Sequence, residues 1–319
     1  MDMLNIFQLK NNCLSKIDDK NKISSLRDII WIDIVQSNDN EYDYIHNILE
    51  QYKIDYFVLK KYEKYEKYDR FFYDEYGIHI RSFFCSYNNQ NQINNSIVFF
   101  TIYKDCLYTF RKECFPVFGM CQKTLHRNVL IDGNAYELLL NLFEMKLNDL
   151  TDKLENIYSD LEKMGLVVMS EQQVDEYDTV LANLSELENK GWKIRINLLD
   201  TERAIRFLAR KTDLPETQKS YAHEILNDIT LLLPYNECIL HKVSFLTQSV
   251  MGLINIEQNR IIKIFSIVFL PPTLIASSYG MNFDFMPELQ WSFGYPSAII
   301  LMILAGLAPY LYFKYKNWL

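Results

Sequence analysis

The chain has 319 residues and a net charge of −8, and 49% of its residues are hydrophobic. This length is enough for two domains, while the mean hydropathy of −0.13 excludes a chain that lies wholly within a membrane. The acidic balance argues against nucleic acid as the main partner. The six cysteines contain no CxxC pair, and the first residues lack both a basic and an apolar region. We therefore expect reduced thiols, no zinc site and no signal peptide.

The N-terminal part, residues 1–130, is predicted to be an α+β domain. β-branched and aromatic residues recur there in short runs between turn residues, which is typical of strands. The turns are marked by Gly77 and by Lys104-Asp105, and a helix is predicted from Asn38 to Tyr52. The predicted strands cover residues 28–35, 71–73, 78–84, 96–103 and 106–110.

From Asn134 the hydrophobic period becomes helical. Apolar residues then follow one another at spacings of three and four, which indicates a heptad-like seam on a long helix. Two further helices are predicted over residues 171–188 and 192–211, before Leu214-Pro215 breaks the pattern. The residues of the first seam are Leu140, Phe143, Leu147, Leu150, Leu154, Ile157, Leu161 and Met164.

A second seam runs from Ile225 to Leu253 within a segment that extends from Glu216 to Tyr279. As one helix this segment would be roughly 96 Å long. Such a helix must bury its seam against copies of itself or against the preceding helices. Pro234 is expected to kink the helix or to remove one hydrogen bond. Residues 131–259 are therefore predicted to form a helical stalk.

Two stretches without charge follow, at residues 264–278 and 292–313. The second is long enough for a bilayer core of ~30 Å, and the first needs its polar flanks to reach the interface. Pro271 and Pro272 open the hydrogen bonding of the first stretch, which then needs protein neighbours or water. We predict membrane helices at 260–282 and 292–313, joined by a periplasmic loop at 283–291 and followed by a basic tail at 314–319.

The flanking charges predict the orientation. Basic residues precede the first apolar stretch and follow the second, whereas the loop between them carries Asp284 and Glu288. The positive-inside rule therefore places both termini, and with them the α+β domain, in the cytoplasm. The basic residues are Arg260, Lys263, Lys314 and Lys316.

Two membrane helices cannot enclose a pore, so a transporter of this kind requires several copies around one axis. Asn259, Ser266, Thr273 and Ser277 lie near one face of the first helix, as pore-lining residues would. The second helix is nearly all apolar and suits an outer ring that faces lipid. The alternative is a packing face of small residues between two anchoring helices.

The hairpin between the two spans carries a motif of a known family. Tyr279-Gly280-Met281-Asn282 followed by Met286-Pro287-Glu288-Leu289 resembles the signature of the CorA magnesium and cobalt transporters, a group defined by a GMN triplet. A GMN triplet alone is a weak signal, but GMN with MPEL between two C-terminal spans is highly specific. Segments throughout the chain are similar to enterobacterial members of the family: residues 132–140, 155–163, 254–260 and 310–313.

This resemblance implies a homopentamer in the bacterial inner membrane, with a funnel-shaped cytoplasmic body and a central pore lined by the first span. It implies that divalent ions bound between the cytoplasmic parts of the subunits close the pore. Glu224 and Asp228 are the candidate ligands, and a solvated helix face is the alternative interpretation of these two residues. The implied selectivity filter is Gly280, Met281 and Asn282, and the implied pore-lining residues are Asn259 at the cytoplasmic entrance, Leu270 at a constriction, Thr273 and Ser277.

One departure from the family pattern concerns the first span. In similar members the segment between NRIIKIF and FLPPT is about three residues longer. Removing three residues shortens a helix by ~4.5 Å and rotates its two parts by ~60° relative to each other. Either the helix adjusts, or gating is altered, or this chain conducts poorly because Asn259 turns away from the axis.

We therefore expect passive Mg²⁺ influx, with Co²⁺ and Ni²⁺ as further substrates, driven by the membrane potential. The chain contains no GxxxxGK[ST] motif for ATP and no pattern of an enzyme, so we expect no cofactor besides Mg²⁺ as substrate and regulatory ligand. Two alternatives remain: a Zn²⁺ transporter of the same superfamily, against which the MPEL loop argues, and a membrane-tethered scaffold without ion flux.

Overall fold

The computed structural model describes residues 4–10, 12–17, 29–35, 70–87, 93–127, 130–169, 177–282, 284 and 286–316. The chain divides into two compact units, which are described separately. The first comprises Met1–Val167 and Ala182–Ser244, and the second comprises Val168–Leu181 and Phe245–Leu319. The helix predicted from Asn38 to Tyr52 lies outside the described residues.

The first unit contains a seven-stranded sheet in the order β2-β1-β3-β7-β6-β5-β4. Neighbouring strands are antiparallel except for β3 and β7, which are parallel. All five predicted strands are confirmed, whereas the first two strands of the sheet were not predicted. The strands are β1 (Leu4–Lys10), β2 (Cys13–Lys16), β3 (Ile29–Val35), β4 (Phe71–Asp74), β5 (Gly77–Tyr87), β6 (Ile93–Tyr103) and β7 (Cys106–Arg111).

The two predicted turns both contain residues with positive φ. Lys104 and Asp105 both have positive φ, at 49° and 61°, which is the geometry of a two-residue turn that matches the twist of a hairpin. Gly77 has a φ of 106°, and a β-carbon there would lie 2.0 Å from the carbonyl oxygen of Ile102. Only glycine fits that close approach between β5 and β6.

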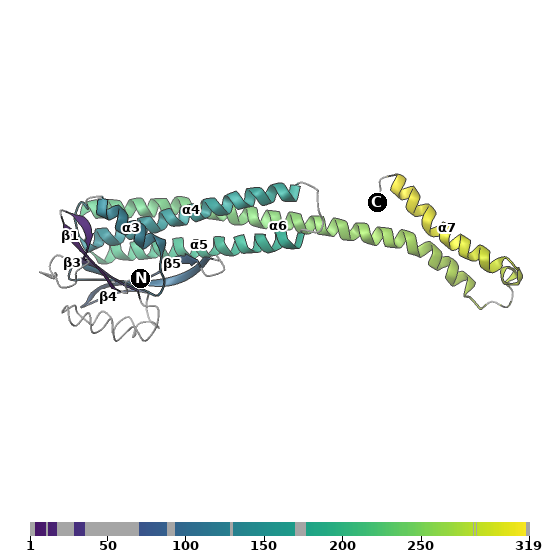
Figure 1. Cartoon of the computed structure of the whole chain (residues 1–319), viewed down its shortest axis with the longest axis horizontal. Helices are drawn as coiled ribbons and strands as arrows, with labels where there is room; N and C mark the ends of the chain where they lie inside the picture. The colour runs from purple at the N-terminus through teal and green to yellow at the C-terminus, as the bar shows by residue number, and fades with distance from the viewer. Residues whose placement is uncertain are drawn as a thin grey trace. The chain divides into compact units, whose positions relative to one another are not determined.

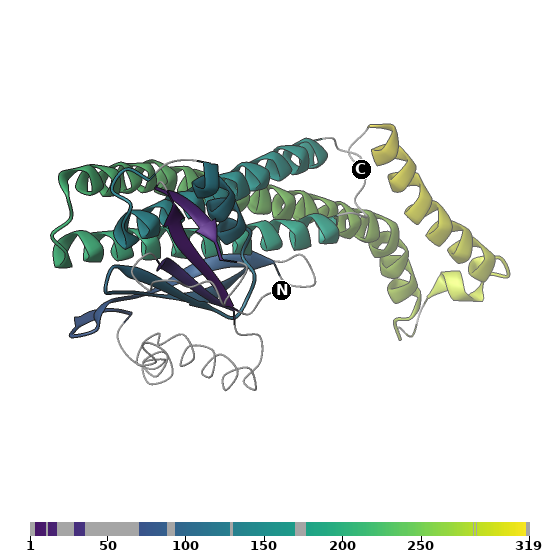
Figure 2. The same cartoon turned by 60° about the vertical axis from the view of Figure 1, so that its left-hand side comes forward.

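Helices cover one face of the sheet (Figures 1 and 2). Trp31 and Phe84 contact Phe118 of α3 (Pro116–Arg127), with ring centroids 6.1 and 5.7 Å apart, and Phe100 contacts Phe143 of α4 (Ala135–Met169) at 5.7 Å. The aromatic side chains of alternate strand positions thus fill the layer between sheet and helices.

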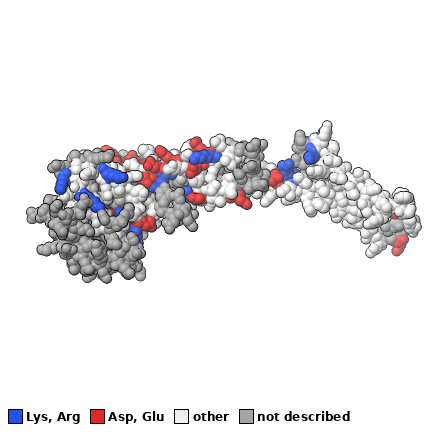
Figure 3. Space-filling view, in the orientation of Figure 1, with Lys and Arg blue, Asp and Glu red and all other residues white. Residues whose placement is uncertain are grey.

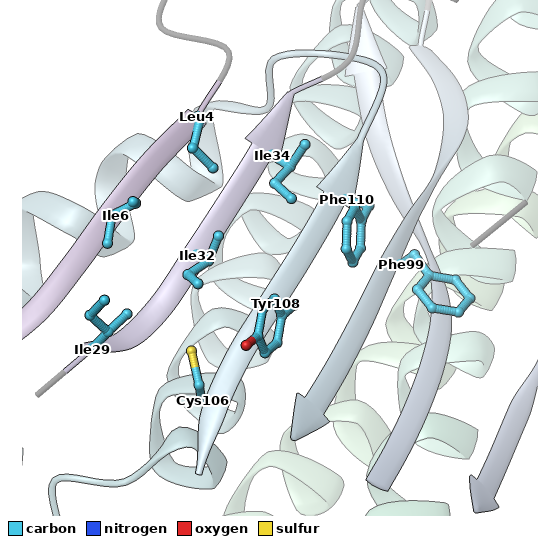
Figure 4. Close-up of a cluster of buried hydrophobic side chains, with 9 residues drawn as sticks. All are labelled: Leu4, Ile6, Ile29, Ile32, Ile34, Phe99, Cys106, Tyr108 and Phe110. Atoms are coloured by element: carbon cyan, nitrogen blue, oxygen red, sulfur yellow. The ribbon is translucent and has the colours of Figure 1, made fainter. Parts of the chain in front are cut away.

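The opposite face of the sheet carries a second apolar cluster (Figure 4). Its side chains come from β1, β3, β6 and β7, and most of them alternate along their strand with side chains that face the helices. Ile29 departs from this alternation because the register of β1 and β3 shifts between Phe7 and Gln8. The sheet therefore has buried apolar residues on both faces. The cluster contains Leu4, Ile6, Ile29, Ile32, Ile34, Phe99, Cys106, Tyr108 and Phe110.

The long helix α4 begins where the sequence pattern changes. The side-chain oxygen of Asn134 accepts a hydrogen bond of 2.9 Å from the backbone N–H of Glu137. The carboxylate of Glu137 in turn accepts the N–H groups of Ile131, Asp132 and Gly133. This reciprocal cap satisfies donors at the helix start that have no partner within the helix.

The prediction of two separate helices at 171–188 and 192–211 is wrong. The structure has one helix, α5 (Tyr177–Lys211), which continues through Gly191. A β-carbon at Gly191 would lie 2.9 Å from Cδ2 of Leu240, and its carbonyl oxygen accepts a hydrogen bond of 3.0 Å from Asn236. Gly191 is therefore a point of close helix packing and not a helix end.

The predicted long helix is confirmed as α6 (Glu216–Tyr279), a single element of 64 residues that continues through Pro234. Its seam is buried within the chain itself by the preceding helices. The hydroxyl of Tyr221 donates to Glu144 of α4 at 2.6 Å, and Asn236 contacts α5. The buried seam residues are Ile225, Ile229, Asn236, Ile239, Val243, Leu246 and Val250.

A buried polar network ties α4 and α5 to the sheet. Lys146 of α4 donates to the hydroxyl of Ser82 at 3.1 Å, and this hydroxyl donates to Asp200 of α5 at 2.8 Å. Asp200 also accepts the N–H of Phe83 and a guanidinium N–H of Arg70, both at 2.8 Å. Burial lowers the pKa of Lys146 to about 8, although the charge of Asp200 opposes this shift.

We predict that this lysine makes stability depend on pH. Between pH 8 and 10.5 the unfolded chain keeps the Lys146 proton while the folded chain loses it, so stability should rise with pH by up to about 1.4 kcal/mol per pH unit. The denaturation midpoint of the wild type, measured on the full chain in detergent, should therefore rise relative to that of Lys146→Met over this pH range. The exposed Lys163→Met is the control, and a constant wild-type–Lys146→Met difference from pH 7 to 10.5 would contradict the prediction.

Candidate functional site

The second unit contains a hairpin of two apolar helices. The C-terminal part of α6 and the helix α7 (Gly294–Tyr315) are each long and apolar enough to cross a membrane, and are hardly buried within the chain. No charged residue occurs between Lys263 and Asp284, or between Glu288 and Lys314. Figure 3 accordingly shows these helices almost without charge, whereas acidic side chains gather on the helices of the first unit.

The predicted filter triplet lies directly after the end of α6. The N–H of Gly280 donates to the carbonyl oxygens of Ala276 and Ser277, at 3.0 and 3.2 Å. Gly280 does not have a positive φ, so it ends the helix without a left-handed conformation. Gly280, Met281 and Asn282 are all exposed. A β-carbon at Gly280 would meet only ordinary contacts, the nearest at 3.4 Å. The triplet thus presents its groups outward at the tip of the helix.

The four predicted pore-lining residues share one face of α6. At 100° per residue, Asn259, Leu270, Thr273 and Ser277 fall within an arc of about 60°. All four are exposed, and Leu270 exposes 66% of its surface. Because α6 is one uninterrupted helix, Asn259 remains on this face despite the short segment that precedes Pro271.

Most half-buried residues of the same stretch lie on the opposite face. Seven of them fall within about 140° of one another on the far side of the helix: Ile264, Ile267, Val268, Pro271, Pro272, Ile275 and Tyr279. Ser266 is also half-buried, although it lies on the same face as Asn259. The covering helix is α7. Its Gly306 is buried, and a β-carbon there would lie 2.9 Å from the carbonyl oxygen of Val268. The packing of α7 therefore leaves Asn259, Leu270, Thr273 and Ser277 uncovered on what we call the free face.

The hydroxyl of Thr273 on the free face is oriented as an acceptor. The hydroxyl of Thr273 donates to the carbonyl oxygen of Phe269 at 2.6 Å. Its proton is thus used within the helix, and its oxygen lone pairs remain available to a group on the free face. Such an oxygen can accept hydrogen bonds from water molecules around a cation.

The loop between the helices is short and acidic. Asp284 and Glu288 are exposed, and Glu288 belongs to the 3₁₀ turn η5 (Pro287–Gln290). Gly294 begins α7 so close to this turn that a β-carbon would lie 2.2 Å from the carbonyl oxygen of Glu288. The ring of Trp291 contacts that of Phe293 at 6.0 Å. The loop therefore places two carboxylates shortly after the filter triplet in the sequence, and one of them, Glu288, lies on a turn that packs closely against Gly294.

The family model described as CorA-like Mg²⁺ transporter protein matches residues 27–315 of this chain. The chain belongs to the CorA family. It is 67% identical over 99% of its length to the whole of the magnesium transport protein CorA of Blochmanniella pennsylvanica (strain BPEN). It is 53% identical, over 99% of its length, to the whole of the protein of the same name from Salmonella typhimurium (strain LT2).

Solved structures show the same fold as this CorA-family chain. The complete structure of the CorA magnesium transporter from Methanocaldococcus jannaschii matches with a TM-score of 0.72, over 100% of this chain and 99% of that chain. The sequence identity is 17%, so this match concerns the fold. The predicted order of an α+β domain, a long helix and two C-terminal apolar helices is thereby confirmed.

The two candidate regulatory residues of this CorA-family chain, Glu224 and Asp228, are exposed on α6 in the first unit. Glu224 lines an open hollow of about 580 Å³ together with Asp132 and Gln218, whereas Asp228 does not line it. Within the described part of the chain, no three His, Cys, Asp or Glu side chains are grouped so as to hold a metal ion. The structure of one chain therefore does not join the two candidates into a site.

Sequence reasoning did not find the contacts of Gly294 and Gly306. Both glycines allow a backbone carbonyl to approach closely, at Glu288 and at Val268. A signal for the second contact was present, because Pro272 stands four residues after Val268 and deprives its carbonyl of a donor. The partner residue on α7 could not be identified without the packing of the two helices.

We predict that Gly294→Ala displaces the loop. The added methyl group would overlap the carbonyl of Glu288, so α7 or η5 must shift and the midpoint of thermal unfolding in detergent should fall by a few degrees. Gly252→Ala is the matched control, since a β-carbon at this exposed helical position meets nothing within 4 Å. Equal unfolding midpoints for the two variants would show that the loop absorbs the methyl group without strain.

Proposed function

We propose that this chain is one subunit of a Mg²⁺ transporter whose pathway is lined by the free polar face of α6. The observation that carries the proposal is the division of α6 into two faces. Its Val268–Pro272 side is covered by α7, while Asn259, Thr273 and Ser277 remain uncovered on the other. A polar face on a helix long enough to span a membrane needs protein or water beside it and not lipid.

A closed ring of subunits supplies that environment. Two spans cannot enclose a pore, so copies of the chain must surround the axis with α6 inside and the apolar α7 outside. We propose a homopentamer in the bacterial inner membrane, with membrane segments 260–282 and 292–313. The loop 283–291 lies on the periplasmic side, and both termini lie in the cytoplasm, because the basic residues flank the hairpin and the loop is acidic.

The chemistry of Mg²⁺ fits neutral oxygen groups. Mg²⁺ gives up its water reluctantly and prefers six octahedral oxygen ligands. Rings of Asn282 amides and of Thr273 hydroxyl oxygens can bind the water shell of the ion without removing it, whereas a ring of carboxylates would hinder release. Asp284 and Glu288 raise the cation concentration at the mouth, and Leu270 forms a hydrophobic constriction.

The membrane potential supplies the driving force. A charge that crosses the membrane gains ~2.3 kcal/mol per 100 mV, and a divalent ion gains about twice that. Inward flux of Mg²⁺, and of Co²⁺ and Ni²⁺ with similar hydration, therefore needs no nucleotide. We propose that intracellular divalent ions close the pathway through sites between subunits that include Glu224 and Asp228.

The Zn²⁺ alternative and the scaffold alternative predict different fluxes. Cobalt hexaammine has an inert shell that mimics hydrated Mg²⁺. A pathway for hydrated Mg²⁺ should conduct in proteoliposomes at a fixed potential and be blocked by this complex. A Zn²⁺ transporter would carry Zn²⁺ in preference, and a scaffold would carry neither ion. Absence of Mg²⁺ flux from correctly assembled oligomers would refute the proposed function.

Asn282→Ala tests the filter. The variant loses the amide that holds the hydrated ion, and a hydrogen bond to a charged species is worth about 1.5–3 kcal/mol, so selective Mg²⁺ uptake should fall about tenfold or more. Native mass spectrometry should show the same oligomer as the wild type. Asn227→Ala, at an exposed position of α6 in the first unit, is the control and should keep full uptake. Unchanged selectivity in Asn282→Ala would remove this residue from the filter.

The double variant Asp284→Asn/Glu288→Gln tests the acidic mouth. Removing two negative charges per subunit should lower the initial rate of Mg²⁺ uptake at low ionic strength, and the difference should shrink as salt screens the charges. The control Asp178→Asn/Glu188→Gln changes the net charge equally at exposed positions of α5. A rate that is equally low in both variants, or independent of salt, would contradict a local role of the loop.

A further inference from the structure

Two prolines interrupt the backbone hydrogen bonding of α6 within its apolar part. Pro271 and Pro272 have no N–H group, so the carbonyl oxygens of Ile267 and Val268 receive no hydrogen bond from the residue four positions later. Such an interruption is tolerated in an apolar environment when a neighbouring helix covers the freed groups. It is also the point at which a helix bends most easily.

Gly306 of α7 lies against this interruption. A β-carbon at position 306 would be 2.9 Å from the carbonyl oxygen of Val268 and 3.3 Å from Cγ of Pro272. Gly306 is buried, whereas the adjacent Leu307 exposes 52% of its surface. Only a hydrogen atom fits between the helices here, and the Cα–H group of glycine can act as a weak donor to the freed carbonyl.

The contact lies opposite the free polar face. Val268 and Pro272 are on the covered side of α6, and Thr273 and Ser277 are on the other. The residues after the prolines form one helical segment that ends at Tyr279, directly before the filter triplet. A bend or rotation at Pro271-Pro272 would therefore move Thr273, Ser277 and Asn282 together.

We infer that Gly306 is a positioning residue for the ion pathway. By seating α7 against Val268 and Pro272, it holds the last segment of α6 in the direction that aligns Thr273, Ser277 and Asn282. Gly306 acts through α6 and does not contact the ion. The role in transport depends on the proposed function, whereas the contact can be tested without transport.

Gly306→Ala adds one methyl group at the contact. Gly252→Ala makes the same chemical change on α6, where a β-carbon would meet nothing within 4 Å. Both exchanges raise helix propensity by a similar amount, so their difference reports the contact. We expect Mg²⁺ uptake at a fixed potential, and block by cobalt hexaammine, to weaken on the order of tenfold in Gly306→Ala and to remain unchanged in Gly252→Ala.

A double-mutant cycle separates positioning from a general defect of α7. Pro272→Ala restores an N–H for the Val268 carbonyl and removes the ring carbon that faces position 306. In that background Gly306→Ala should lower uptake only about twofold, because the two residues are coupled. An equal loss in both backgrounds would overturn the inference. If Gly306→Ala does not assemble, assembly becomes the quantity measured, and Pro272→Ala must restore it.

Amide hydrogen exchange provides a measurement that does not depend on ion flux. In nanodiscs, the peptide covering residues 273–282 should exchange faster in Gly306→Ala than in Gly252→Ala, because the segment is no longer held. Equal exchange in the two variants would overturn the inference. If the wild-type protein did not transport Mg²⁺, only the proposed function would be refuted. The exchange comparison would still decide whether Gly306 holds the segment.

Discussion

The backbone of α6 must keep its hydrogen bonds satisfied along 64 residues that pass through two different surroundings. In the first unit the helix buries a seam of aliphatic side chains against α4 and α5, and water can reach its outer face. Beyond Lys263 the helix is apolar, and no water is available to the lipid-facing backbone. A continuous run of intrahelical bonds meets both conditions except at the prolines. Pro234 is exposed in the first unit, and at Pro271-Pro272 Gly306 of α7 packs against the carbonyl of Val268.

This constraint explains why α6 has two faces near its end. The covered face must lie where the freed carbonyl of Val268 needs a neighbour, so α7 has one side on which to pack. The polar residues Asn259, Thr273 and Ser277 are left on the other side, where the proposed ring of subunits would surround them with protein and water. The prolines thus determine on which side of α6 the helix α7 packs, and that packing determines which side is left for the proposed pathway.

In the first unit, polar contacts and close packing connect the sheet, α4, α5 and the start of α6. The Lys146–Ser82–Asp200 network joins α4, β5 and α5, and the close approach of Gly191 to Leu240 joins α5 to α6. Lys146 and Asp200 are buried, and the loss of one partner of a buried charged pair is strongly destabilising, so the network favours a single arrangement of sheet and helices.

The sequence by itself determined the type of most elements and the membrane hairpin. Periods of two and 3.5 residues located five strands and the long helices, because burial on one face imposes those periods on the side chains. The GMN and MPEL motifs between two uncharged stretches were enough to predict the family. The tertiary structure decided which glycines end an element and which lie in a contact. Gly191 interrupts a helical pattern, yet the helix continues, because Leu240 requires the space. Nor could periodicity show that α7 packs on the Val268 side of α6, since that depends on which backbone carbonyl lacks a donor and which residue on another helix is small enough to approach it.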